Sequence, residues 1–309
     1  MISVIKNGWQ RTSGIRRYVV LLYVLNLLVG VSLASIVGRE IARSLGHSLA
    51  ANQMIDSFAP LWFQEFSRHA EGLVRTFHPA VSGMGAILSP LDALITGRPF
   101  QAFPGLVWLG VAYILLWVLF SAGAFGKMAS DTERSFWNAV GTYWGRFVVL
   151  GGVFGIVYYL ILGQLLPVLS ASIRQMTRDV TDERIVFYYT LGKWLVVWLL
   201  ALFTHLAFDF SRIAAVAHNI RFVPRAMLQG VGMVFKHPLR TLGLMGIFLI
   251  IALLGMVGYA LLAPDARGGT MGVIFLTFFI GQIYLLFRMV MRLWLWGSEV
   301  ALWQDVHQG

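Results

Sequence analysis

The chain has 309 residues, of which 58% are hydrophobic and 12% charged, and its formal net charge at pH 7 is +10. Several uninterrupted apolar runs of about twenty residues exclude a soluble globular domain and indicate a protein that crosses a membrane repeatedly as α-helices. The runs do not alternate as the strands of a β-barrel do. The chain has no cysteine, which excludes disulfides, thiolate metal sites and thiol nucleophiles.

The sequence predicts an all-α fold, a polytopic membrane helical bundle with six transmembrane helices. The spans are expected at residues 18–38, 104–125, 147–169, 193–216, 241–263 and 271–293. With the N-terminus in the cytoplasm, the cytoplasmic segments hold fourteen Lys and Arg against five acidic residues. The positive-inside rule therefore predicts that both termini are cytoplasmic, and the short loops and charge bias fit a bacterial cytoplasmic (inner) membrane. This bias also explains the net charge without nucleic acid as a partner.

The chain divides into four predicted segments. Residues 1–38 form an N-terminal interfacial helix and the first span, and residues 39–103 form a small helical extracytoplasmic insertion with an amphipathic helix that starts near Pro60 and carries Trp62, Phe66, Leu73 and Phe77 on one face. Residues 104–216 hold the second to fourth spans and a cytoplasmic elbow helix at 130–146. Residues 217–309 hold a second elbow at 222–237, the last two spans and a C-terminal cytoplasmic segment.

The two elbows belong to an internal repeat. Residues 134–156 placed over 225–247 give six identities in 23 positions, among them Arg134 with Arg225 and Gly152 with Gly243. Each copy is an amphipathic stretch expected to lie in the membrane interface and to bend into the following span. With the N-terminal helix as a third copy, the chain is predicted to consist of three units of elbow, outgoing helix and returning helix.

One polar cluster interrupts the fourth span. His205, Asp209 and Arg212 are spaced i, i+4 and i+7, which places them on one helical face. A charge inside the membrane usually faces the bundle interior and has a partner. The structural interpretation pairs Asp209 with Arg212, or with Arg288 or Arg292 of the last span. The functional interpretation makes His205 and Asp209 a protonatable pair that faces a water-filled cavity.

Glycines are the second notable feature inside the spans, because they allow helices to approach each other closely. Gly151 and Gly155 form a GxxxG pair in the third span, and Gly243 and Gly246 lie in the fifth, so these four are predicted to let helices pack closely. The alternative is a broken or mobile helix, for which Gly163 and Pro167 of the third span are the best candidates.

The sequence contains no P-loop, HExxH, GxSxG or Rossmann glycine pattern. We therefore expect no catalytic site, no cofactor and no metal. The leading hypothesis is a structural or interaction subunit of a membrane complex, in contact with the lipid bilayer and with protein partners through residues 39–103 or the elbows. The alternatives are a transporter of a small or lipidic molecule, with or without proton coupling through His205 and Asp209, and a lipid-modifying membrane enzyme.

Overall fold

The structure is a computed structural model that describes residues 1–46, 48, 50–51, 59–77, 107–129, 135–263 and 271–308. These residues contain no β-strand and include six helices long and apolar enough to cross a membrane, which confirms the all-α polytopic class. The chain splits into two compact units, which we describe separately. The first holds residues 1–15, 114–248 and 293–309, and the second holds residues 16–113 and 249–292.

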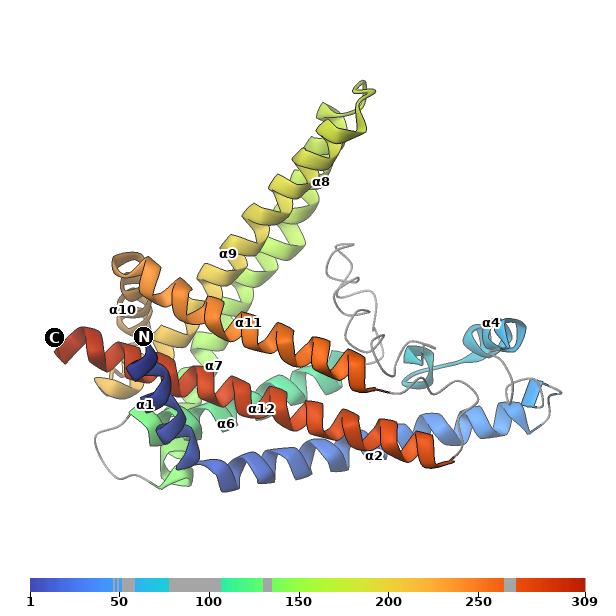
Figure 1. Cartoon of the computed structure of the whole chain (residues 1–309), viewed down its shortest axis with the longest axis horizontal. Coiled ribbons are helices and arrows are strands. Elements are labelled where there is room, and N and C mark those ends of the chain that lie inside the picture. The colour runs from blue at the N-terminus through green and yellow to red at the C-terminus, as the bar shows by residue number, and fades with distance from the viewer. Residues whose placement is uncertain are drawn as a thin grey trace. The chain divides into compact units, whose positions relative to one another are not determined.

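Each of the six predicted spans has a corresponding helix (Figure 1). They are α2 (Arg16–Leu45), α6 (Val107–Ala129), α7 (Phe136–Tyr159) with its continuation through α8 (Leu166–Met176), α9 (Glu183–Ala217), α11 (Pro238–Leu262) and α12 (Met271–Gln308). The last helix does not end near residue 293 as predicted but continues to Gln308, so most of the segment assigned to a cytoplasmic tail belongs to α12.

A separate helix occupies the predicted elbow at 222–237. This helix, α10 (Val223–Lys236), ends at His237, whose φ of −128° and ψ of 52° lie outside the helical region. Pro238 then starts α11. Because a proline disfavours the helical conformation of the residue before it, Pro238 produces the break between the two helices.

The predicted elbow at 130–146 is wrong as a separate bent helix. The helix α7 begins at Phe136 and runs to Tyr159 without interruption, so residues 136–146 are continuous with the third span. Phe147 stands where the aligned copy has Pro238, and nothing between residues 136 and 159 breaks the helix. Residues 130–134 lie outside the described residues.

The third span changes from α-helical to π-helical geometry around Gly163 and Pro167, the two residues that the sequence indicates as candidates for a break. A π-helical turn, η3 (Leu160–Leu165), separates α7 from α8, and Pro167 lies in the first turn of α8. A proline ring inside a helix collides with the carbonyl four residues earlier, here that of Gly163, and a π turn relieves the collision.

Three pairs of helices approach closely in the first unit, each at a small residue where an added Cβ atom would overlap the neighbouring helix. The pairs are Gly8 with Ser298 (α1, Ile2–Ser13, and α12), Gly126 with Ala139 (α6 and α7), and Gly230 with Ser211 (α9 and α10). In these contacts the C-terminal part of α6 packs against the N-terminal part of α7. The C-terminal parts of α9 and α12 pack against the short helices α10 and α1, respectively.

The four glycines predicted to pack helices do not make these contacts. A Cβ atom at Gly155 or Gly246 would have no neighbour within 4 Å among the described residues, and one at Gly151 would lie 3.9 Å from Val118. One at Gly243 would lie 3.5 Å from the flexible side chain of Met1. The GxxxG spacing therefore did not identify the residues at which these helices meet.

The second unit contains a small apolar cluster at the end of α2. The helix α4 (Pro60–His69) begins as predicted and buries Trp62 and Phe66, and the Trp62 indole donates to Ser44 Oγ at 3.0 Å. The helix ends at His69 rather than continuing to Phe77, because Ala70 is extended and Gly72 has a positive φ of 56°. Most of the remaining predicted insertion lies outside the described residues.

Candidate functional site

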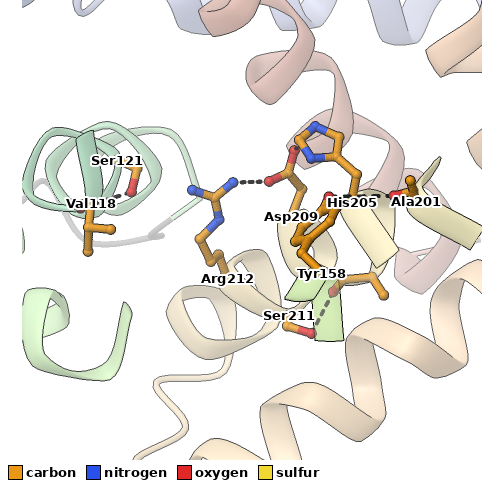
Figure 2. Close-up of polar contacts among 9 residues, drawn as sticks. Val118, Ser121, Tyr158, Ala201, His205, Asp209, Ser211 and Arg212 are labelled. Atoms are coloured by element: carbon orange, nitrogen blue, oxygen red, sulfur yellow. Dashed lines mark hydrogen bonds and ion pairs between the residues drawn. The ribbon is translucent and has the colours of Figure 1, made fainter. Parts of the chain in front are cut away.

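The candidate site lies in the C-terminal half of α9, where Asp209 and Arg212 are buried. The Asp209 side chain is 0% exposed and that of Arg212 is 4% exposed. Their spacing places the two side chains on one helical face, and the Arg212 guanidinium donates to Asp209 Oδ1 (Figure 2). The fixed charges predicted for this span are therefore brought together as an ion pair within one helix.

His205 lies one turn before Asp209 on the same face. Its Nε2 is 3.5 Å from Asp209 Oδ2, and its side chain is 19% exposed (Figure 2). His205 thus stands between the buried carboxylate and the surface of the first unit.

Four aromatic rings surround the Arg212 guanidinium. The distances from its Cζ atom to the ring centroids are 4.2 Å for Phe208, 4.8 Å for Phe125, 5.1 Å for Trp296 and 6.0 Å for Phe147. The rings come from α6, α7, α9 and α12, so the side chain of one residue contacts four helices of the first unit. Cation–π attraction in a desolvated site contributes to holding these helices around the cation.

Glu299 is a further buried charge that the sequence reasoning missed. It is 0% exposed and lies three residues after Trp296 on α12, which places it on the helical face whose indole contacts Arg212. The signal was present, since Glu299 is the one charged residue between residues 293 and 303. Because the last predicted span ends at residue 293, the sequence prediction places Glu299 in the C-terminal cytoplasmic segment.

Arg288 and Arg292, the other candidate partners of Asp209, belong to the second unit and are both exposed. The Arg288 guanidinium lies over the Tyr284 ring at 6.0 Å from the centroid. In the structure Asp209 pairs with Arg212 of its own helix.

The two buried hydroxyls nearby do not form a nucleophile with the carboxylate. Ser211 donates to the carbonyl of Ala207 at 2.6 Å, and Ser121 donates to that of Val118 at 2.9 Å (Figure 2). Each serine therefore uses its proton within its own helix. Among the residues that the structure describes, no group of three His, Asp or Glu side chains could hold a metal ion.

Comparison with protein-family models, with curated proteins and with solved structures gave no match to this chain.

Proposed function

We propose that this integral membrane protein is a non-enzymatic structural or interaction subunit of a membrane assembly. The observation that supports this most directly is the enclosure of the Asp209–Arg212 pair, which is buried and surrounded by rings from four helices. A group that binds or transfers a substrate needs access to it. A pair packed in this way instead fixes the relative positions of helix ends.

The proposal includes a bacterial inner membrane as the location, with both termini in the cytoplasm. The excess of Lys and Arg in the segments at one end of the spans supports this orientation. Partner proteins would then contact residues 39–103 outside, or the short helices α1 and α10 at the cytoplasmic interface. Both short helices expose large apolar residues beside their packed faces, such as Ile2 on α1 and Leu228 on α10.

We also propose a threefold internal repeat. It is supported by the close helix contacts and not by the alignment of residues 134–156 with 225–247. The three close helix contacts fall within similar sequences at the ends of α6, α9 and α12. These sequences, each a small residue, a charged residue, an aliphatic residue and alanine, are 126–129, 211–214 and 298–301. In this register Arg212 and Glu299 are equivalent, and both are buried, whereas the equivalent Lys127 is exposed. Each contact joins the end of a returning helix to α1, to α10 or to the N-terminal part of α7.

A second candidate function, proton-coupled transport, is favoured by one observation. His205 connects the buried carboxylate to the surface, and a histidine so placed can pass a proton between the two. This function requires that the Asp209 carboxylate exchange protons during turnover, whereas the structural role requires that it stay ionised and paired.

Proton flux and thermal stability measured on the same variants distinguish the two functions. The purified protein is reconstituted in liposomes that contain a pH-sensitive dye, and a potassium diffusion potential is imposed. A structural subunit gives no flux above that of protein-free liposomes, for the wild type and for His205→Gln alike, while Asp209→Asn lowers the melting temperature. Flux in the wild type that His205→Gln abolishes without a loss of stability would overturn the structural proposal.

A further inference from the structure

Two adjoining pockets open at the surface of the first unit beside α10. Their volumes are about 610 and 570 Å³, and they share His218, Arg225 and Gln229. Their walls are α10, the turn that precedes it and the C-terminal end of α12, where Trp303 forms part of the lining. We call the two pockets together the basic groove. Volumes of this order are typical of small-molecule sites.

The end of α9 forms the turn that gives the groove its shape. Asn219 adopts a left-handed φ of 46°, the Asn219 N–H donates to Val216 O and the Ile220 N–H donates to Ala215 O, both at 3.1 Å. This is the hydrogen-bond pattern of a Schellman motif, which reverses the chain after a helix. The chain then enters α10, which packs against α9 where Gly230 meets Ser211.

Among the residues that the structure describes, the groove is lined by cationic side chains and by no carboxylate. Arg221, Arg225 and Lys236 supply three formal positive charges, and His218, His237 and His307 also line it. Asp305, on the same helical turn of α12 as His307, instead lies 3.6 Å from Arg240, which is not a lining residue. Such a groove favours an anionic ligand, and arginine and lysine both bind phosphate.

Trp303, which lines the groove, holds the His307 ring in place. The His307 ring stacks on Trp303 with the centroids 4.2 Å apart, and its Nδ1 donates to the Trp303 carbonyl at 2.8 Å. Because Nδ1 is engaged, Nε2 is the nitrogen that remains to contact a ligand. The centroid of the His218 ring lies 6.0 Å from that of His307, so both imidazoles border the same space.

Gln229 indicates a second feature of the ligand. Its Oε1 is buried and accepts no hydrogen bond from the residues that the structure describes. An ionised phosphodiester carries no proton that it could donate to this oxygen, whereas a hydroxyl group does. A ligand that combines a phosphate with a neighbouring hydroxyl satisfies both the cations and this amide oxygen.

We propose that the basic groove binds the headgroup of an anionic phospholipid, with the phosphodiester at Arg225 and Lys236 and a headgroup hydroxyl at Gln229. A lipid is favoured over a soluble phosphate because exposed apolar side chains adjoin the groove: Leu228 on its wall is 74% exposed, and Phe235 of the same helix is 71% exposed. In addition, α10 lies between the end of one span and the start of the next, so we expect it at the level of lipid headgroups. This inference does not depend on the proposed function.

Thermal stability of the full-length protein in detergent, titrated with dioleoyl phosphatidylglycerol, tests the proposal. We expect the melting temperature of the wild type to rise and saturate. Arg225→Gln and Lys236→Gln should each weaken the apparent affinity about fivefold, the effect of removing one cation near an anionic lipid surface. Arg240→Gln is the matched control, since Arg240 is an exposed arginine outside the groove, and it should leave the affinity unchanged.

Two further ligands and one further variant complete the test. Dioleoyl phosphatidylcholine and soluble glycerol phosphate should give no saturable stabilisation over the same concentration range. Gln229→Leu should reduce the preference for phosphatidylglycerol over phosphatidic acid, which lacks the headgroup hydroxyls. The proposal is overturned if phosphatidylcholine stabilises equally, if glycerol phosphate alone reproduces the effect, or if both Arg225→Gln and Lys236→Gln bind as Arg240→Gln does.

Discussion

Replacing Asp209 by alanine leaves the Arg212 guanidinium buried without the carboxylate that accepts its hydrogen bond. Breaking a buried ion pair by removing one partner typically costs about 3–5 kcal/mol. Cation–π contacts to the four surrounding rings remain in the variant and partly stabilise the unpaired cation. We therefore expect a loss near the lower end, about 3 kcal/mol, which is a large part of the 5–15 kcal/mol stability typical of proteins.

The expected ranking of variants follows from the same geometry. A loss of about 3 kcal/mol lowers the melting temperature by roughly 6–12 °C, at about 2–4 °C per kcal/mol. Asp209→Asn keeps a hydrogen-bond acceptor in the same shape and should lose about half as much. Asp209→Ala combined with Arg212→Met removes the buried cation and should melt above Asp209→Ala alone.

Thermal unfolding in detergent, followed by differential scanning fluorimetry, measures these differences. Asp305→Ala is the control, because its pair with Arg240 is more than half exposed on both sides and contributes less than about 1 kcal/mol. The reasoning is refuted if Asp209→Ala melts within about 2 °C of the wild type, or if the double variant melts below Asp209→Ala.

Three other outcomes are expected. Gly230→Ala places a Cβ atom 2.3 Å from the backbone of α9 and should cost about 1–3 kcal/mol, whereas Gly155→Ala, with no neighbour within 4 Å, should be neutral or slightly stabilising; thermal unfolding of both compares them. Glu299→Ala should destabilise more than Glu299→Gln in the same assay, because a group 0% exposed leaves its surroundings unsatisfied when it is truncated. Single cysteines introduced near Arg68 and near Arg225 should react with impermeant reagents from opposite sides of the membrane, and reaction of both from one side would contradict the topology.

The six membrane helices could be predicted from the sequence because their signal is local. Whether a run of apolar residues is long enough to cross the bilayer depends on that run alone and not on the rest of the chain. The elbow predicted at 130–146 has no such local signal. Its similarity to 222–237 rests on glycines and aromatic residues, which do not determine whether the helix breaks. The backbone outcome depends on a single position, where Pro238 breaks one copy and Phe147 continues the other.

In the candidate site, too, the local feature could be predicted from the sequence and the contacts between helices could not. Helical spacing alone places Asp209 beside Arg212, so the pair could be found without a fold. The rings of Phe125 and Trp296 come from helices far away in the sequence, and no periodicity within α9 points to them. Only the packing of the first unit shows that the charged pair is enclosed rather than open to a cavity.

The contacts of α1 have a consequence for how the chain is made. Thr12 donates to the carbonyl of Leu293 at 3.1 Å, and the Trp294 indole donates to the carbonyl of Ile5 at 2.9 Å. The residues of α1 thus complete their packing only with residues of α12, which are synthesised much later. Until α12 is inserted, the face of α1 around Gly8 has no helix to cover it, so the first unit cannot finish folding during translation. A truncation within α12 is therefore expected to expose α1 to quality-control proteases.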